Sequence, residues 1–471
     1  MDYLAETYGA VGDGKTDDSK AIQKAIDSCA NAGGGRVILS GARVYASSSL
    51  VLKQNVNLHL EKGAVLRASA DLETYYRPNE GQRDDGVDRI GTPVTLKPSY
   101  AFIYARDADG IAISGEGVID GNCYAFVKRV SSYYVTGEIY PRPTMIYVEH
   151  CDHISFRDVT MQNSPFWTLH PAGCDDVLIE NLRILNPLDV ANSDGIDPDH
   201  SSNVRVIGCH ITCADDCICL KSSAGNMEYG PTENVLIADC TLTSTSAAIK
   251  IGTEGTGHFR NVIVHDCVIS RSNRGISIQI RDEGNVEHLI FSNIMIETRR
   301  FADCWWGTAE PICVTTHDRD EGTVSGHIRD ITFENIICDS ENGVFFSGGE
   351  SGGESGGESG GESGAEFGEK SEGKASGEDD RIQDVYLRNV QVRMSSKSRW
   401  PKGMYDLRPG YGKGIEARPS SGFLFRHVDG LAMENCSVRF ADKAGGAFGE
   451  AVEFESCRRV RNDCFSELSE E

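Results

Sequence analysis

The chain has 471 residues, with 46 lysines and arginines against 71 aspartates and glutamates, which gives a net charge of −25. This negative excess argues against nucleic-acid partners and against docking on anionic membranes, because both need a basic surface. Hydrophobic residues make up 39% of the chain, enough for a large core, which excludes a globally disordered protein.

The first predicted element is a short amphipathic helix near the N-terminus. Asp17 or Asp18 can serve as its N-cap, and the glycines at 33–35 end it. We expect this helix to cover the open end of a stack of strands, which would otherwise expose strand edges. The apolar residues at helical spacing are Ala21, Ile22, Ala25, Ile26 and Cys29.

The N-terminal residues 1–6 lack the basic start and the apolar stretch of a signal peptide. We therefore expect a cytoplasmic protein if the chain is complete, and a secreted one if a leader was removed. The 16 cysteines include no Cys-x-x-Cys pair. We expect them to be reduced and mostly buried, and a few disulfides in an exported form are the alternative.

From about residue 145 a repeat takes over, in which each block is a short strand, a polar bend and a second short strand. The second residues of the blocks lie at positions 154, 177, 204, 235, 262 and 289. A period in the twenties with strands and no helix predicts a β-solenoid, and the frame of a leucine-rich repeat is missing. We expect an all-β, single-stranded parallel β-helix, in which Cys209, Cys240, Cys267 and Cys436 share one internal position.

The whole chain, residues 1–471, is predicted to form one β-helix domain. We expect an N-terminal cap and the first coils over 1–70, the catalytic coils over 145–345 and C-terminal coils over 381–471. Residues 347–380 repeat Ser-Gly-Gly-Glu and continue as an acidic, Gly- and Ser-rich stretch. Such a composition cannot bury a core, so it predicts a mobile loop inserted in the solenoid.

Two acidic clusters carry the chemistry: residues 192–199, which read Asn-Ser-Asp-Gly-Ile-Asp-Pro-Asp, and the pair Asp215-Asp216. Asp194 and Asp216 are 22 residues apart, close to one coil, so the clusters should lie on neighbouring coils. Like charges packed that closely cost stability and raise the pKa of at least one carboxyl. Two uses justify such an arrangement, a calcium site or acid–base work on a glycosidic bond.

These motifs resemble those of glycoside hydrolase family 28, the polygalacturonase family, marked by Asn-Thr-Asp-Gly, Gly-Asp-Asp, Gly-His-Gly and Arg-x-Lys. Residues 8–18 are similar to the motif at the start of the family's sequences, and residues 142–146 and 163–171 are similar to motifs of its bacterial-type branch. The resemblance implies a right-handed parallel β-helix and an inverting hydrolase that cleaves α-linked, pectin-derived oligosaccharides of galacturonan or rhamnogalacturonan. We expect no cofactor and no metal.

The resemblance also assigns roles to the acidic residues. Asp215 would be the general acid, and Asp194 and Asp216 would hold and activate the water. Inversion requires an acid and a base about 6.5–9.5 Å apart, a gap that stacked coils can supply. Asn192 and Asp197 would be supporting groups that orient these carboxylates or touch a sugar hydroxyl.

The sequence departs from the family pattern in two places. The Gly-His-Gly motif falls near residues 246–248, which hold no histidine, so His258, Lys250 and Glu254 become the candidates there. The Arg-x-Lys pair, which reads the galacturonate carboxylate in polygalacturonases, falls on residues 277–279 without either charge. Arg281 and Lys221 are the candidate cations instead, and rhamnogalacturonan or another pectin-derived oligosaccharide joins the expected substrates.

Loops around 70–100, 123–142 and 299–316 are long enough to wall off the cleft and favour exo attack. Several aromatic residues in loops or at strand ends are candidates for stacking on sugars, namely Tyr133, Tyr134, Tyr140, Phe166, Trp167, Trp305 and Trp306. Two other functions stay open at this point: a β-helix polysaccharide lyase whose aspartates hold calcium, and a non-catalytic carbohydrate-binding solenoid. The sequence makes no prediction of the oligomeric state.

Overall fold

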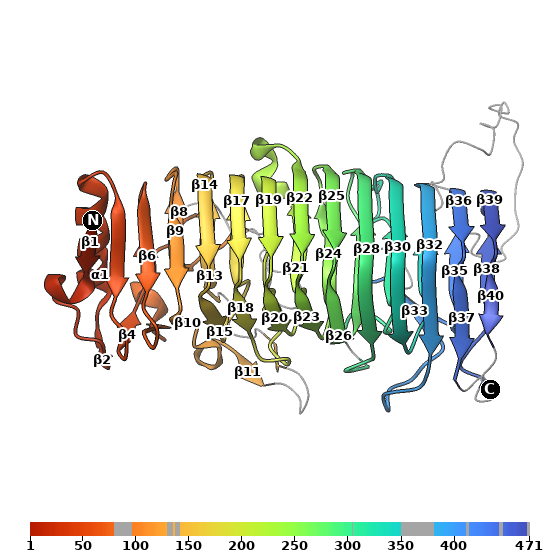
Figure 1. Cartoon of the computed structure of the whole chain (residues 1–471), viewed down its shortest axis with the longest axis horizontal. Helices are drawn as coiled ribbons and strands as arrows, with labels where there is room; N and C mark the ends of the chain where they lie inside the picture. Colours follow the sequence, from red (N-terminus) through yellow and green to blue (C-terminus); the bar gives the residue numbers. More distant parts are fainter. Residues whose placement is uncertain are drawn as a thin grey trace, which may run out of the picture.

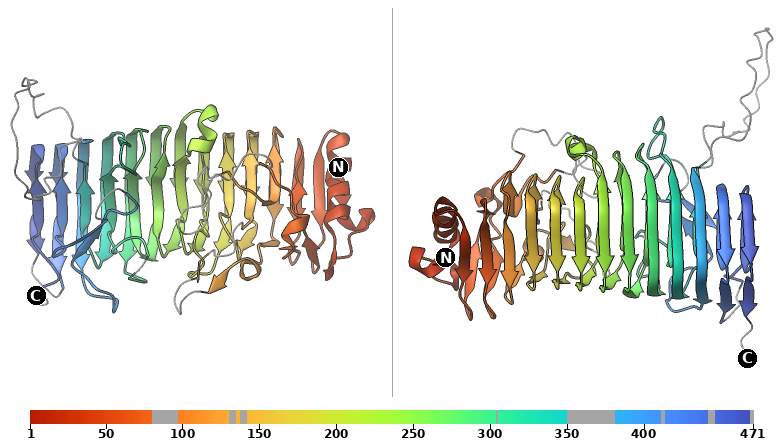
Figure 2. Two further views of the ribbon diagram at one scale, coloured as in Figure 1. Left: turned by 180° about the vertical axis from the view of Figure 1, so that it is seen from behind. Right: turned by 45° about the horizontal axis from the view of Figure 1, so that its top comes forward.

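The chain folds into one long stack of parallel coils, with the N-terminal helix at one end (Figure 1; Figure 2). The structure is a computed structural model, and it describes residues 1–79, 97–129, 135–136, 142–303, 305–349, 381–410, 414–441 and 446–468. A full coil carries up to three short strands, and each strand pairs in parallel with its equivalent on the next coil. The fold is therefore the predicted right-handed parallel β-helix.

Two of the three rows of strands merge into one 25-stranded sheet. The first row consists of β1 (Asp2–Leu4), β3 (Gly35–Leu39), β6 (Val56–Leu60), β9 (Ala112–Gly115), β14 (Asp152–Arg157), β17 (Asp175–Glu180), β19 (Ser202–Ile207), β22 (Thr232–Ala238), β25 (Phe259–His265), β28 (Val286–Thr298), β30 (Ile328–Ser340), β32 (Ile382–Met394), β36 (Val428–Glu434) and β39 (Arg458–Asp463). Because β28, β30 and β32 are long enough to run through both rows, the remaining strands of the second row are β2 (Asp13–Asp17), β4 (Val44–Ser47), β7 (Val65–Ala68), β10 (Val118–Asp120), β15 (Thr160–Gln162), β18 (Arg183–Leu185), β20 (His210–Cys213), β23 (Thr241–Ser244), β26 (Val268–Ser272), β37 (Ser437–Phe440) and β40 (Ser466–Leu468).

The third row, which we call the site sheet, forms a separate face of the solenoid. Its strands are β5 (Leu50–Val51), β8 (Ala101–Arg106), β13 (Thr144–Glu149), β16 (Leu169–Ala172), β21 (Ile218–Ser222), β24 (Ala247–Gly255), β27 (Arg274–Ile280), β29 (Ile312–Thr316), β31 (Val344–Ser347), β35 (Phe423–Arg426) and β38 (Val452–Glu455). Between β16 and β21 the chain makes one coil without a regular strand in this row. On that coil only Ile196 and Asp199 form isolated bridges to both neighbours. The irregular coil interrupts the site sheet and frees its side chains for other uses.

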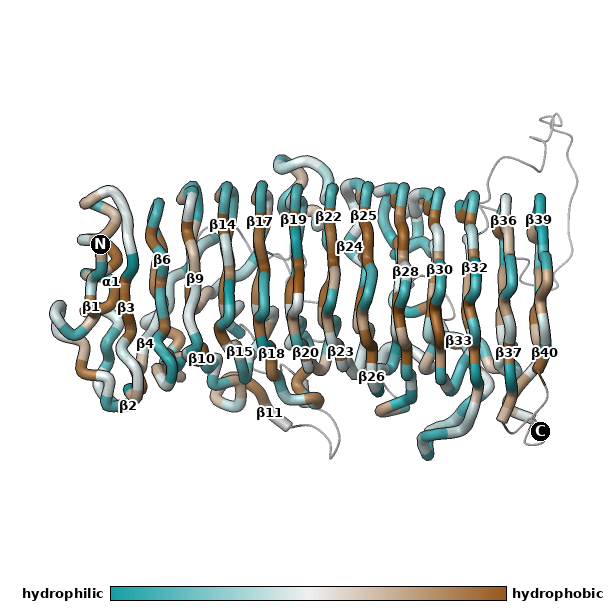
Figure 3. Tube along the Cα trace, viewed as in Figure 1, coloured by the Kyte–Doolittle hydropathy of each residue, from teal (hydrophilic) through white to brown (hydrophobic). Residues whose placement is uncertain are grey.

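The predicted repeat is confirmed in the pairing register of the first row. Ile154 pairs with Val177, which pairs with Val204, and the ladder continues through the later blocks to Leu289. These side chains are buried, and apolar and polar residues alternate along the strands (Figure 3). Cys209, Cys240, Cys267 and Cys436 are buried as well, and none of the described cysteines forms a disulfide bond.

Each coil bends between the first and second rows at a residue with left-handed backbone geometry. Asparagine and aspartate often occupy this position, as at Asn293, Asn335 and Asn389, whose φ angles are 55–56°. These residue types reach that region at lower cost than most others. Their side chains also stack, since Asn335 Nδ2 donates to Asn293 Oδ1 at 3.2 Å and Asn389 Nδ2 donates to Asn335 Oδ1 at 2.8 Å. The bend folds a strand-forming segment around a corner of the solenoid.

The predicted N-terminal helix is α1 (Ser19–Asn31), which packs against β1, β3, β5 and β6 at the end of the stack. Asp17 Oδ1 accepts from Ser19 N at 3.0 Å, whereas Asp18 accepts from the backbone of the preceding loop. The other helical elements are single 3-10 segments: η1 (Ala5–Tyr8), η2 (Leu72–Thr74), η3 (Cys123–Ala125) and η4 (Ala224–Tyr229). Among the described residues, none of these helices has the length and apolar character needed to cross a bilayer.

In the part of the chain that the structure describes, two pairs of antiparallel strands lie outside the coils, β11 (Lys128–Arg129) with β12 (Val135–Thr136), and β33 (Met404–Asp406) with β34 (Ile415–Ala417). The second belongs to the connection between β32 and β35. We call its residues 400–410 the strap, because they cross the site sheet at β27. Gln279 Nε2 donates to Arg408 O at 3.5 Å, and Arg274 Nη2 donates to Asp406 O at 2.6 Å.

Two expectations concern parts of the chain outside the described residues. The predicted mobile loop over 347–380 lies outside them from residue 350 on, and so do Tyr133, Tyr134 and Tyr140. These stay predictions.

Candidate active site

The two acidic clusters meet on neighbouring coils. Asp194 lies on the irregular coil between β18 and β19, and Asp215 and Asp216 lie in the turn that precedes β21. Gly195 N donates to Asp216 O at 2.9 Å, and a Cβ on Gly195 would lie only 2.3 Å from Cys217 O. Glycine is therefore required there for the two coils to approach each other.

The three aspartates converge more closely than the sequence predicted. Each offers one carboxylate oxygen, and these oxygens all lie within 4.8 Å of one another. The expected gap of about 6.5–9.5 Å between acid and base is therefore wrong for these oxygen atoms. The reason lies in the fold, because neighbouring coils are only about 4.8 Å apart.

Asp216 is the aspartate whose charge is best compensated. Its Oδ1 accepts from Ser246 Oγ at 2.9 Å and from Ala247 N at 3.1 Å. Its Oδ2 lies 2.9 Å from Lys250 Nζ. Two donors and a cation therefore contact this carboxyl group. Lys250 is thus largely buried and paired, not solvated.

Asp215 has far less support. Its side chain accepts from Asn192 N at 3.1 Å, and burial together with the charge of Asp216 raises the pKa of Asp215 to about 7. Burial and the charge of Asp215 also raise the pKa of Asp194 well above its ordinary value. All three side chains are at most 5% exposed, so solvent does little to relieve the repulsion. Unequal compensation therefore gives chemically different roles to adjacent carboxyl groups.

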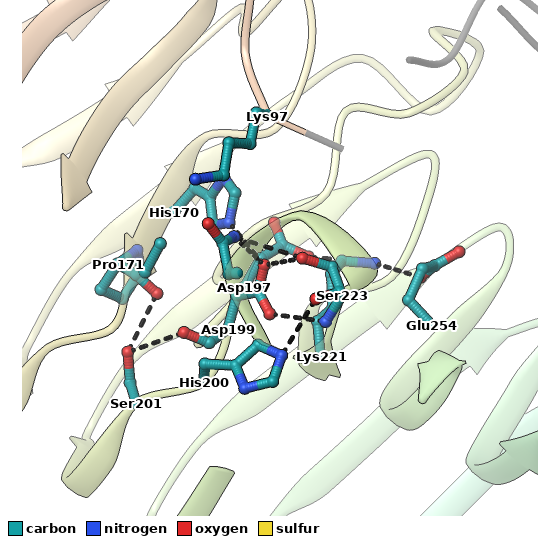
Figure 4. A network of polar contacts seen from close by, with 12 residues as sticks. Lys97, His170, Pro171, Asp197, Asp199, His200, Ser201, Lys221, Ser223 and Glu254 are labelled. Atoms are coloured by element: carbon teal, nitrogen blue, oxygen red, sulfur yellow. Dashed lines mark hydrogen bonds and ion pairs between the residues drawn. The ribbon is translucent and has the colours of Figure 1, made fainter. Parts of the chain in front are cut away.

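Lys221 lies among the remaining acidic groups (Figure 4). Its Nζ is 3.2 Å from Glu254 Oε2, 3.7 Å from Asp197 Oδ1 and 3.9 Å from Asp194 Oδ2. It also lies 4.3 Å from the centre of the Trp167 ring. Burial opposes the charge, but the surrounding acidic groups outweigh it and raise the pKa of Lys221. Burial likewise opposes the charge of Glu254, yet Lys221 holds its pKa at about 2.

Asn192 positions the acid cluster through its backbone and is itself held in place. Its φ angle of 56° lies in the left-handed region, and its N–H donates to Asp215. Arg142 Nη2 donates to Asn192 Oδ1 at 2.7 Å, and Arg142 Nη1 donates to Ala191 O at 2.6 Å. The sequence reasoning missed the roles of Arg142 and Ser246, although both fall in segments that the family resemblance had already singled out.

Two predicted site residues lie elsewhere. His258 is exposed in the turn between β24 and β25, where its Nδ1 accepts from Asn285 N at 3.1 Å. Arg281 is fully buried, and burial lowers its pKa to about 9. Its guanidinium donates to Leu407 O at 2.9 Å, to Thr315 Oγ1 at 2.9 Å and to Pro409 O. Arg281 therefore anchors the strap, and the predicted substrate contact is wrong for this residue.

Of the predicted aromatic residues, Trp167, Trp305 and Trp306 lie near the site. Trp305 and Trp306 belong to the segment before β29, and they cluster with Ala191, the residue before Asn192. The two indole rings are 5.7 Å apart, and the Arg408 guanidinium of the strap lies 5.4 Å from the Trp306 ring. The structure thus gathers Asn192, Asp194, Asp197, Asp215, Asp216, Lys221, Lys250 and Glu254, and leaves out His258 and Arg281.

Comparison with known proteins identifies the family of the chain. Residues 92–350 match the family model of the glycosyl hydrolases family 28. A probable polygalacturonase of Vitis vinifera is 32% identical over 265 residues, which cover 53% of this chain and 51% of that protein. An endo-polygalacturonase of Pectobacterium parmentieri is 26% identical over 347 residues, or 71% of this chain and 81% of that protein. The chain thus spans about half the length of several curated relatives it matches.

Solved structures show the same fold. The chain is similar to an exopolygalacturonase of Thermotoga maritima with a TM-score of 0.63 and 19% identity, over 99% of this chain and 92% of that one. It is also similar to a family 28 exopolygalacturonase of Yersinia enterocolitica, with a TM-score of 0.61 and 16% identity, over 98% of this chain and 78% of that one. At these identities the likeness concerns the fold alone.

Proposed function

Because the chain belongs to family 28 of the glycosyl hydrolases, we propose that it is an inverting, exo-acting hydrolase of α-glycosidic bonds in pectin-derived oligosaccharides. The observation that carries this proposal is the convergence of three carboxyl groups with unequal compensation. Asp215, with a pKa of about 7, is the general acid that protonates the leaving oxygen. Asp194 and Asp216 bind and activate the attacking water.

The charges around the cluster support this division of roles. Asp216 is held in place by Lys250 and two hydrogen-bond donors, so its carboxyl group is positioned to orient water. One oxygen of Asp194, Oδ1, is buried and accepts no hydrogen bond from a described residue. A buried oxygen without a partner favours an occupant, and a water shared with Asp216 satisfies it.

The short separation of the aspartates also favours a second mechanism. Carboxyl groups about 5–5.5 Å apart are typical of retaining enzymes, in which one carboxylate attacks the sugar directly. In that case Asp194 or Asp216 would form a covalent intermediate. We prefer inversion, because the resemblance implies it and because Asp194 and Asp216 form a pair able to hold a water.

The strap supports exo action. It crosses the site sheet at β27, the coil that follows Lys250 and Glu254, and Arg274, Gln279 and Arg281 bind its backbone. A polymer lying along the whole sheet would collide with these residues. We infer that a chain end enters from the opposite side, which suits short galacturonan or rhamnogalacturonan oligosaccharides.

We expect hydrolysis to release the β-anomer first, since inversion of an α-linkage requires it. The measurement is NMR of the anomeric protons during cleavage of galacturonan and rhamnogalacturonan oligosaccharides, with the released sugar identified by chromatography. Initial release of the α-anomer would replace inversion by the retaining mechanism. Products that absorb in the ultraviolet, together with loss of activity in a chelator, would instead indicate the calcium-dependent lyase.

We expect kcat/KM to fall about tenfold per pH unit above pH 7, because Asp215 then loses the proton that it must donate. Lys250 stabilises the ionised form of Asp215, so its replacement makes ionisation harder. The variant Lys250→Met should therefore shift the fall in kcat/KM to higher pH, whatever its rate at the optimum. An unchanged pH for this fall in the variant would contradict the assignment of Asp215 as the acid.

A further inference from the structure

A row of buried polar groups that make no hydrogen bond to a described residue runs along the site sheet on the N-terminal side of the aspartates. The row consists of the hydroxyl of Tyr147, Nδ1 of His170 and both carboxylate oxygens of Asp197. Asp197 is compensated by the charge of Lys221, which lies 3.7 Å from its Oδ1. Buried polar groups nearly always have a partner, so the Tyr147 hydroxyl and the His170 nitrogen call for an explanation.

The three residues occupy equivalent positions on successive coils. Tyr147 of β13 pairs with His170 of β16, and their rings are 5.0 Å apart. The bridges of Leu169 to Ile196 and of Ala172 to Asp199 place His170 beside Asp197 on the irregular coil (Figure 4). Adjacent coils are about 4.8 Å apart, a spacing similar to the length of one sugar unit.

The chemistry of His170 is fixed by its other nitrogen. Nε2 lies 3.3 Å from Asp199 Oδ2. Asp199 is itself held by Ser223 N at 2.9 Å, Ser223 Oγ at 2.6 Å and Asn226 Nδ2 at 2.7 Å. Asp199 thus occupies Nε2, and Nδ1 is the ring nitrogen left for another contact. The neighbouring phenol of Tyr147 is a donor, because burial keeps it protonated.

A phenol hydroxyl and a ring nitrogen on adjacent coils match sugar hydroxyl groups, because each sugar hydroxyl can both donate and accept. Tyr147 and His170 are fully buried and the three aspartates are 2–5% exposed, so the row and the reaction site are covered to a similar degree. The edge of His170 also meets the Trp167 ring, at 4.9 Å between centres and 78° between planes, and Trp167 in turn contacts Lys221. The row is thus continuous with the catalytic cluster.

We propose that Tyr147 and His170 form a binding subsite for the ring hydroxyls of a sugar one or two units from the scissile bond, on the N-terminal side of Asp194, Asp215 and Asp216. This inference rests on the proposed function, and it names residues that select the substrate. The subsite would favour oligosaccharides long enough to reach it.

The test is Tyr147→Phe, which removes only the unpartnered hydroxyl. We expect kcat/KM on the longest cleaved oligosaccharide to fall about three- to tenfold through a higher KM, with kcat and the thermal unfolding midpoint unchanged. The matched control is Tyr45→Phe in the first coils, whose buried hydroxyl donates to Glu6. The control should lower the unfolding midpoint and leave the kinetics unchanged.

Binding is measured separately from turnover by calorimetry in the Asp215→Asn background. There Tyr147→Phe should weaken the binding of the same oligosaccharide by the same factor. Equal affinities with and without the Tyr147 hydroxyl, or no binding by either variant, would overturn the subsite. Absence of hydrolysis by the unmodified protein would overturn the proposed function instead, and the calorimetry would still decide the subsite.

Discussion

Replacing Asp215 by asparagine is expected to lower kcat by about 10²–10⁴-fold, because the amide has the shape of the protonated acid but no acidic proton to give. Single-turnover kinetics on a cleaved oligosaccharide measures this loss. The matched control is Asp239→Asn, an exposed position on the following coil where asparagine also suits the φ angle of 56°. The control should retain full activity. A kcat of the Asp215→Asn variant within tenfold of that of the unmodified protein would contradict the acid role.

The same substitution should change how stability depends on pH. The pKa of Asp215 is raised to about 7 in the folded protein, from an ordinary value of 3.8. Between these values the folded state binds more protons than the unfolded one, so stability falls as pH rises through this window. Asp215→Asn should remove the part of this loss of stability that comes from Asp215. Its free energy of unfolding, compared with that of the unmodified protein, should therefore be more favourable at pH 8 than at pH 4, as urea unfolding at both pH values would show.

The second large effect is expected for Lys221→Met. It leaves the buried Asp194 and Asp197 and the partly exposed Glu254 without their shared cation. Removal of one partner from a buried ionic cluster costs about 3–5 kcal/mol, because the remaining charges stay desolvated and uncompensated. Urea unfolding at pH 7 measures the change in the free energy of unfolding.

The control for this variant is Lys53→Met, which removes a lysine paired with Asp27 at 2.7 Å on the surface. Exposed pairs contribute at most about 1 kcal/mol, so the control should differ little from the unmodified protein. Adding Glu254→Gln to Lys221→Met should restore part of the lost stability. If Lys221→Met costs no more than the control, the acidic groups do not depend on Lys221 for compensation.

Much of the fold could be predicted because the pattern of apolar and polar residues repeats in the sequence once per coil. The blocks around Ile154, Val177 and Val204 carry the same alternation of apolar and polar residues, and that alternation sets the pairing register. The spacing of Asp194 and Asp216 by about one coil then placed both on adjacent rungs. Local pattern and global fold agree here, which is why the sequence was sufficient.

The surroundings of the aspartates could not be predicted in the same way. The strap joins β27 across more than 120 residues of chain, and no periodicity connects Arg281 with Leu407 or Pro409. Strand alternation placed Arg281 on the expected face, but it could not show that a later segment covers that face. The prediction for His258 failed for a related reason. Its nearness in sequence to the position of the missing motif did not place it on the same side of the turn.

The strap also makes completion of the active site a late event in biosynthesis. Chains fold from the N-terminus as they leave the ribosome, so the coils with all three aspartates can stack before residues 400–410 exist. Until then the guanidinium of Arg281 lacks the carbonyl groups of Leu407 and Pro409 that later bind it. A nascent chain would thus carry an assembled acid cluster beside an uncovered β27, and the strap would cover that strand only when the last coils emerge.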